Sequence, residues 1–392
     1  MKTTYLFVLF IVEIILSSCV DEYNLPKDID SIYKQELVIE GRILSGEESV
    51  FYITRTIPLT SSMKSDNVTN AIITIIGQNG YESQPAEFIE DAKYTLKTEE
   101  LNNNTFYAVR IVVDGETYQS NFQTLLNTPD IDEVAWKEYE GGISVYVSTH
   151  NDNQNTRCYM WTYEEDWEFH AEMDLKNTTA VPLYNEKFYP MEGKNNPYYY
   201  CWGKQHSSLL YIYSTEDLSD NFVRNKELIK ISVDDVRISY IYSMLVKQWV
   251  ITPEAYEYYR LMKLYTEESN GLFTPMPSDV RGNILCTSDP EKKVRGFVIA
   301  SDIKQKRIFI YSTDFKLNKS EYTNCSVQTP DLNNKYWQEG WYNLINNAGF
   351  VALTLNGSLT EGSMLYSREC VDCKKTKGAS KKRPDFWPND HQ

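Results

Sequence analysis

The sequence has little of the chemistry that common enzyme classes need. It contains four histidines in 392 residues, and these show no metal-ligand spacing. It has no His-Glu-x-x-His motif, no Gly-x-Ser-x-Gly motif, no glycine-rich phosphate loop and no dinucleotide fingerprint. These absences exclude the recognisable zinc peptidases, serine hydrolases, nucleotide-binding enzymes and dehydrogenases, and they predict neither a metal nor a cofactor.

Positive charge is also scarce. The chain carries 39 lysines and arginines against 55 aspartates and glutamates, so its formal net charge is -16. A protein with this charge repels nucleic acid and anionic lipid. We therefore expect no nucleic-acid partner, and attachment to a membrane must come from a covalent lipid rather than from charge.

The apolar run near the start of the chain is short. The stretch from Tyr5 to Leu16 is interrupted by Glu13 and falls below the roughly 20 residues that cross a bilayer. It follows Lys2 and ends at Ser17-Ser18-Cys19, an arrangement that is typical of a secretory signal. The sequence therefore predicts an exported protein.

Small residues before Cys19 resemble the lipobox of bacterial lipoproteins, in which the cysteine is acylated and its amine becomes the new N-terminus. We expect residues 1–18 to be a removed signal peptide and Cys19 to carry fatty chains such as palmitate. More than one chain gives stable anchoring, whereas a single chain binds only marginally. The polar residues that follow, up to residue 33, predict a flexible tether.

Six cysteines remain after Cys19, and an even number in an exported protein permits disulfides. The candidates are Cys158, Cys201, Cys286, Cys325, Cys370 and Cys373. Spacing alone does not choose the pairing, and free buried cysteines are the alternative. For the Cys370-x-x-Cys373 pair we favour a structural role over a zinc or redox site, either as a local disulfide or as links to other cysteines.

Short β segments separated by turn residues dominate from residue 34 onward. The chain is 42% hydrophobic and has 30 tyrosines, which favour strands. The strands predicted for the first domain span residues 37–43, 50–56, 71–76, 106–113 and 117–122. This pattern is typical of an antiparallel β-sandwich, which we place at residues 34–128.

The rest of the chain, residues 129–392, is predicted to form a larger β-rich domain. One amphipathic helix stands out at about residues 253–269. Thr252-Pro253-Glu254 supplies an N-cap, a proline at the first helical position and an acid at the positive helix end, and Asn270-Gly271 ends the helix. A second, shorter helix is predicted at residues 336–347. The overall fold class is therefore mainly β.

A cluster of aromatic residues in the larger domain is the candidate ligand-binding site. Flat aromatic faces with a polar edge suit sugar rings, peptides or a protein partner. The residues singled out are Trp161, Trp167, Tyr198, Tyr199, Tyr200 and Trp202. The alternative is that they belong to the core of a β-sandwich.

Two charged runs have a functional and a structural interpretation. Acids at Glu164, Glu165, Asp166 and Glu168 include pairs that would suit a glycosidase, although a solvated face is favoured. Near the C-terminus, six cations gather between Lys374 and Arg383. They would attract an acidic partner, although a solvated loop is favoured.

Several segments along the mature chain resemble one known family. They are Ser17-Ser18-Cys19, residues 37–41, 252–258, 277–286, 294–297 and 306–310, Cys370-Val371-Asp372-Cys373, and Pro384-Asp385-Phe386-Trp387-Pro388. The chain in these segments resembles the Bacteroidota lipoproteins catalogued as a domain of unknown function, DUF family 4249. Residues 152–196 show no pattern of that family.

The resemblance implies an outer-membrane lipoprotein with an immunoglobulin-like or transthyretin-like N-terminal sandwich. Asp21 and Glu22, directly behind Cys19, resemble the surface-export signal of such lipoproteins, so we expect the protein to face the cell surface. Such proteins are often encoded beside TonB-dependent transporters, and no catalytic residues are established for them. The leading hypothesis is therefore a non-enzymatic accessory of a TonB-dependent transporter that captures a nutrient such as a glycan or peptide, or acts as a lid. The alternatives are a surface adhesin or assembly protein and, third, a hydrolase with an unrecognised carboxylate site.

Overall fold

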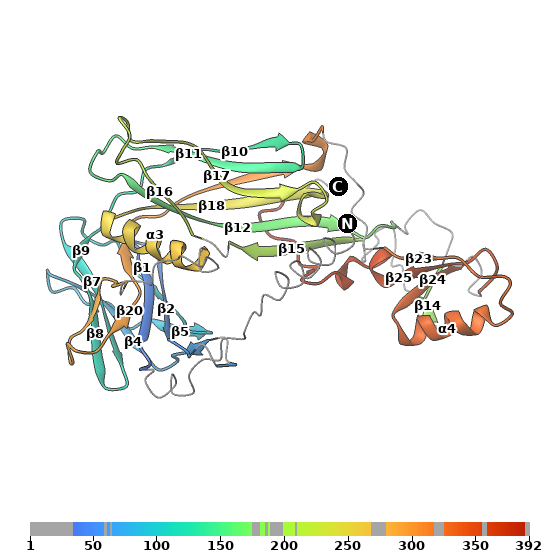
Figure 1. Ribbon diagram of the computed structural model, residues 1–392, viewed down its shortest axis with the longest axis horizontal. Coiled ribbons are helices and arrows are strands. Elements are labelled where there is room, and N and C mark those ends of the chain that lie inside the picture. Colours follow the sequence, from blue (N-terminus) through green and yellow to red (C-terminus); the bar gives the residue numbers. More distant parts are fainter. Residues whose placement is uncertain are drawn as a thin grey trace, which may run out of the picture.

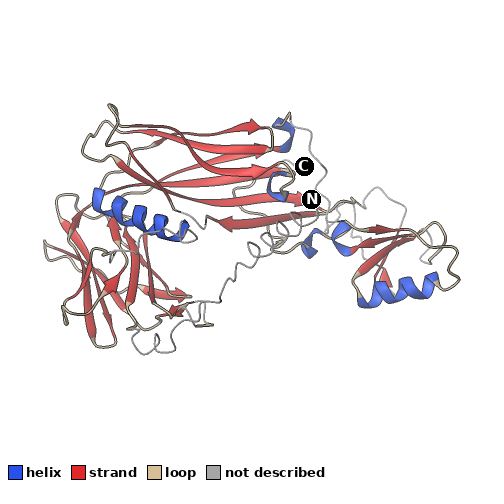
Figure 2. Cartoon of the chain, in the orientation of Figure 1, coloured by secondary structure: helices blue, strands red, loops and turns tan. Residues whose placement is uncertain are grey.

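The computed structural model describes residues 34–58, 61–62, 65–174, 181–184, 187–188, 199–207, 210–267, 280–316, 325–354 and 359–388. The predicted signal peptide, Cys19, the tether and Tyr198 lie outside the described residues. The chain is mainly β, as predicted, and its strands are arranged in several largely antiparallel sheets (Figure 2). No helix in these ranges is long and apolar enough to cross a membrane.

The first domain is a sandwich of two sheets. One sheet contains β1 (Leu37–Ile43), β2 (Glu48–Arg55), β3 (Asp66–Asn67), β5 (Glu87–Glu90), β6 (Lys93–Lys97), β20 (Val294–Arg295) and β21 (Val298–Ala300). The other contains β4 (Ile72–Gly77), β7 (Phe106–Val113), β8 (Glu116–Ser120), β9 (Gln123–Thr124) and β19 (Ile284–Cys286). Alternate residues of both sheets, such as Ile39, Phe51, Ile73 and Ile111, are fully buried in one shared core.

Three strands of this sandwich come from far along the chain. β20 and β21 run parallel to β1, and β19 pairs antiparallel with β8. The side chain of Asn283 bonds both backbone groups of Val298, with its amide donating at 2.7 Å and its oxygen accepting at 2.9 Å. The sandwich therefore includes residues 284–300. The predicted domain, residues 34–128, omitted them.

The larger domain packs two sheets face to face. The first contains β10 (Ile131–Tyr139), β11 (Gly142–His150) and β17 (Phe222–Ser232). The second contains β12 (Cys158–His170), β15 (Tyr200–His206), β16 (Tyr211–Ser214), β18 (Ile241–Ile251) and β22 (Lys304–Tyr311), with η2 (Val236–Ile238) before β18 and η3 (Ser312–Asp314) after β22. Odd-numbered residues of β12, such as Tyr159 and Trp161, fill the core between the sheets.

The even-numbered residues of β12 point to the opposite side of its sheet, which we call the outer face. At one end of this face, α3 (Pro253–Glu267) packs on Cys158 and Met160. Tyr258 of the helix also lies 5.4 Å, ring to ring, from Phe297 of the sandwich. The helix predicted at residues 253–269 is thus confirmed, and it wedges between the two domains (Figure 1).

Two neighbouring segments join the sandwich to the larger domain. The Leu126 amide donates to the Ala300 carbonyl at 3.1 Å, and the Asp302 amide donates to the Leu126 carbonyl at 2.9 Å. The buried hydroxyls of Thr128 and Ser301 are 2.9 Å apart. Because these two connecting segments are hydrogen-bonded to each other, they hold the two domains in a fixed arrangement.

A small third unit was not anticipated within residues 129–392. It combines β13 (Val181–Tyr184) and β14 (Lys187–Phe188) with β23 (Val327–Gln328), β24 (Phe350–Thr354) and β25 (Met364–Ser367). The predicted second helix is confirmed as α4 (Trp337–Asn347), which buries Trp341 and Ile345 against this sheet. After η4 (Arg368–Cys370) and η5 (Cys373–Lys375), the chain returns to the larger domain (Figure 1).

The close approach of β20 and β21 to β1 yields a stability prediction at Gly296. This residue has φ +105°, and a Cβ there would lie 1.8 Å from the Ile39 carbonyl oxygen. We expect Gly296→Ala to lower the free energy of unfolding by about 3 kcal/mol, because it adds both backbone strain and a steric clash. Denaturation followed by circular dichroism measures the loss.

The control for this variant is Gly340→Ala. Gly340 lies in α4, and a Cβ there would meet nothing within 4 Å. This change should be neutral or stabilise the protein by up to about 1 kcal/mol, since alanine favours the helix. Equal effects of the two substitutions would contradict the assigned backbone contact.

Candidate functional site

The structure places the predicted aromatic cluster mostly inside the protein. Trp161 is fully buried, stacks on Tyr159 at 5.7 Å between ring centroids and donates its indole N–H to Gln248 at 2.8 Å. Trp167 also points toward the core face and packs on Gly203. The prediction of ligand binding by Trp161 is therefore wrong, because its side chain lies on the core face of β12, between the two packed sheets.

Two other members of the cluster, Tyr199 and Tyr200, lie beside His170. Its ring centroid lies 4.6 Å from that of Tyr199 and 4.8 Å from that of Tyr200. Trp202 is 9% exposed and packs against Ile241 and Trp387. These residues attach the C-terminal segment to the sheet, and Tyr199 and Tyr200 are half-buried in doing so.

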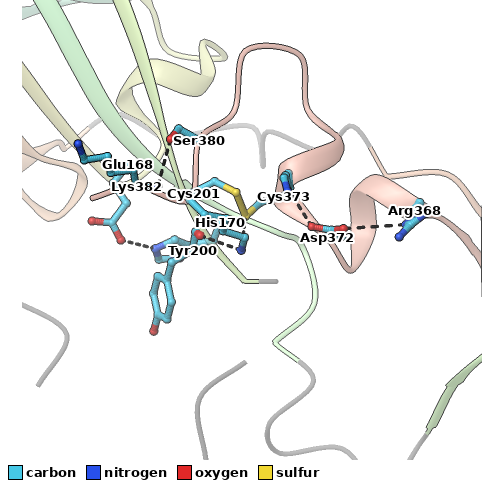
Figure 3. The surroundings of a disulfide bond; sticks show 11 residues. Glu168, His170, Tyr200, Cys201, Arg368, Asp372, Cys373, Ser380 and Lys382 are labelled. Carbon is cyan, nitrogen blue, oxygen red and sulfur yellow. Dashed lines mark hydrogen bonds and ion pairs between the residues drawn. A yellow bond between two sulfur atoms is a disulfide. The ribbon is translucent and has the colours of Figure 1, made fainter. Parts of the chain in front are cut away.

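Two disulfides lie beside this aromatic group. Cys201 of β15 is bonded to Cys373, and Cys325 is bonded to Cys370 within the third unit. The two cysteines of the Cys370-x-x-Cys373 motif are thus not bonded to each other, and each forms a disulfide with a different distant cysteine. Figure 3 shows the Cys201–Cys373 bond between β15 and the returning chain. Cys158 and Cys286 are buried and free.

The run of acids on β12 is largely buried, so its interpretation as a solvated face is wrong. Each buried carboxylate has a partner: Glu165 accepts bonds from Arg237 at 2.9 Å and from the Tyr242 hydroxyl at 2.7 Å, Asp166 lies 3.3 Å from Arg307, and Glu168 accepts from the Trp387 indole at 2.7 Å. Burial raises the pKa of Glu165, although Arg237 and Tyr242 oppose that shift. These three acids therefore have structural partners, and removal of a partner would leave an uncompensated buried charge.

The fourth acid, Glu164, lines a cleft between the two domains. This cleft has a volume of about 530 Å³ and runs along the middle of the outer face. The sandwich contributes Arg42, Tyr52 and Lys93, and the larger domain contributes Glu164, Lys247 and Trp249. Clefts at domain interfaces are common ligand-binding sites, so this is the candidate functional site.

One wall of the cleft carries an ion-pair network around Glu164. Lys247 donates to its carboxylate, and Lys204 and His206 lie 3.8 and 3.9 Å from it. Burial alone would raise the pKa of Glu164, but these cations together hold it below its usual value of 4.5. Glu164 is therefore ionised at neutral pH and is unsuited to act as a general acid.

The opposite wall presents Arg42 and Lys93 together with Glu47 and Glu48. The Arg42 guanidinium lies 4.5 Å from the centre of the Trp249 ring. Within the described residues, neither Arg42 nor Lys93 has an ion-pair partner within 4 Å. Two such cations, of which Arg42 lies over an aromatic ring, suit a polar or anionic ligand.

Analysis of the sequence missed this cleft. Arg42 and Lys247 are separated by about two hundred residues, and neither lies in a recognisable motif. The described residues contain no group of three or more His, Cys, Asp or Glu side chains arranged to hold a metal ion. The arrangement is suited to recognition of a polar molecule through charges, hydroxyls and ring faces.

Comparison with known proteins gives one match. A family model described as a domain of unknown function, DUF4249, matches residues 22–307. A search of curated proteins finds no match. The matched range contains both walls of the cleft, whereas β23 to β25, α4 and the C-terminal segment lie beyond it.

The lowered pKa of Glu164 yields a prediction for pH dependence. A carboxylate whose folded pKa is depressed contributes stability above its unfolded pKa, and that contribution is lost as pH falls through the folded value. Glu164→Gln should thus cost about 1 kcal/mol of unfolding free energy at neutral pH, with the cost shrinking at acidic pH.

Chemical denaturation of both proteins at neutral pH and below the usual glutamate pKa measures this difference. Glu87→Gln, at an exposed position on β5, serves as the control and should change stability by less than about 0.5 kcal/mol. A cost for Glu164→Gln that persists undiminished in acid would contradict the ion-pair assignment.

Proposed function

Because the chain belongs to the DUF4249 family, a domain of unknown function, and encloses a polar interdomain cleft, we propose that it is a non-enzymatic ligand-capture lipoprotein. In this proposal it is anchored in the outer membrane through Cys19, faces the cell surface and serves a TonB-dependent transporter. The observation that carries the proposal is the cleft lined by Arg42, which lies over the Trp249 ring, and by Lys93; neither has an ion-pair partner within 4 Å in the described part of the chain.

The two disulfides support an exported location. Such bonds form and persist in oxidising compartments and are rare where thiols are kept reduced. Residues 20–33 separate the proposed lipid from the sandwich, and fully extended they would reach roughly 50 Å. This length allows the cleft to approach a neighbouring membrane protein without detaching the anchor.

A capture role fits the cleft better than hydrolysis does. Glycosidases need one carboxyl group with a raised pKa beside a second, ionised carboxylate. Glu164 has a lowered pKa and is bound to Lys247, so it cannot supply the proton. A tethered binding protein also needs only modest affinity, because the anchor keeps it at high local concentration near the transporter.

Replacement of the proposed lipidation site tests the anchor. In the Cys19→Ser variant the exported protein should move from the membrane fraction to the soluble fraction, because no acyl chain can form on serine. Cys286→Ser, at a free cysteine, should leave the protein in the membrane fraction. Immunoblotting of fractionated cells gives the readout, and a wild-type protein that is already soluble would refute anchoring.

Co-purification tests the partner. We expect wild-type protein extracted in mild detergent to recover a TonB-dependent transporter, identified by mass spectrometry. The Cys19→Ser variant should recover much less, since it loses the high local concentration that the anchor provides. Recovery of host or matrix proteins with no transporter would overturn this role and favour adhesion.

A further inference from the structure

The outer face contains a second hollow next to the cleft. Its volume is about 430 Å³, and it lies between β15 and the C-terminal segment, with Trp202, Lys204, Lys382 and Phe386 in its lining. We call it the tail pocket. Lys204 joins the two hollows, because it lines the tail pocket and also lies 3.8 Å from Glu164 of the cleft.

The wall formed by the C-terminal segment is firmly attached. Cys373 is bonded to Cys201 (Figure 3). The backbones of Ser380 and Trp202 exchange hydrogen bonds of 2.7 and 2.8 Å. Further along, Trp387 is buried and donates to Glu168 at 2.7 Å. The tail pocket is therefore a built part of the fold and not an accidental surface depression.

The segment that borders the tail pocket is rich in positive charge, and its Lys382 lines the pocket. Segment 374–383 contains six cations and no acid, on a chain with a net charge of -16. Lys374, Lys375, Lys377 and Lys382 are exposed, and none has a carboxylate partner within the described residues. The lining also contains Lys204 and Arg383 together with two acids, Asp385, which is exposed, and Asp166, which is paired with Arg307.

The inner wall adds features that suit a ring-shaped, oxygen-rich ligand. Phe386 is 43% exposed, with the Arg307 guanidinium 3.6 Å from its ring centre. Trp202 also lines the pocket, although it is 9% exposed and its indole nitrogen is buried. The exposed ring of Phe386 is therefore the aromatic surface that matches a sugar ring.

We propose that the tail pocket binds an acidic oligosaccharide, one bearing uronate carboxylates, as a continuation of the cleft. This inference rests on the proposed capture function and names its ligand class. A flat anionic membrane would use the exposed lysines, but it would not enter a hollow lined by Trp202 and Phe386.

Titration calorimetry of the full-length protein in detergent tests the inference with hexagalacturonate, and with maltohexaose as the neutral probe. Hexagalacturonate should bind, more weakly as salt rises, and maltohexaose should bind much less. The double variant Lys377→Gln with Lys382→Gln should bind hexagalacturonate on the order of fivefold more weakly.

The matched control is Lys137→Gln with Lys335→Gln, which removes the same charge from exposed positions outside both hollows. It should bind as the wild type does. Unchanged affinity in the Lys377/Lys382 variant, equal loss in the control, or a tail effect seen only with phosphatidylglycerol vesicles would each overturn the assignment.

A third variant separates this inference from the proposed function. Arg42→Gln with Lys93→Gln alters only the cleft. If it abolishes hexagalacturonate binding while the Lys377/Lys382 variant binds normally, capture in the cleft stands and the tail pocket assignment fails. If wild-type protein binds hexagalacturonate through the tail but recovers no transporter, the assignment stands and the proposed partner fails.

Discussion

Coverage of β12 on both faces is the constraint on which the rest of the structure depends. Its core face packs on a second sheet, so its outer face must also be covered wherever it is apolar or carries desolvated charge. Helix α3 and the sandwich cover one end, and the C-terminal segment covers the other through Trp387. The polar middle, around Thr162 and Glu164, remains open as the cleft. A buried carboxylate without a partner would cost several kcal/mol, which explains why Asp166 and Glu168 each have one.

The cleft keeps its shape because the domains are joined in three ways. The segments around Leu126 and Ser301 are bonded to each other as they cross. Only residues 301–303 separate β21 of the sandwich from β22 of the larger sheet. Helix α3 contacts both domains through Tyr258. The two walls are thus held at a fixed separation, so a ligand that bridges Arg42 and Lys247 would not have to close a hinge. Such preorganisation lowers the entropic cost of binding.

Local patterns in the sequence were sufficient to predict individual strands and helices, but they were insufficient to predict the interdomain cleft. Strand β1 was predicted with its observed bounds, and α3 was predicted from its cap residues and helical spacing. The covering of both faces of β12 has no local signal, so Trp161 was assigned to a binding surface and Asp166 to solvent. The return of residues 284–300 to the sandwich is a long-range pairing. One residue in the sequence reflects this pairing. Gly296 has a positive φ and lies so close to the Ile39 backbone that only glycine fits there.

The two disulfides hold the parts of the chain that lie beyond the family-matched range. The third unit has a small core around Trp341 and Ile345, and small cores supply little stability without covalent links. Cys325–Cys370 provides such a link, typically worth about 2–4 kcal/mol. Cys201–Cys373 fixes the C-terminal segment to β15, which lies within that range. The cleft needs only residues inside the matched range, whereas the tail pocket also needs residues outside it. Under the proposals above, ligand capture would belong to the part of the chain that the family shares. A preference for acidic sugars would depend on the segment that the Cys201–Cys373 bond holds in place.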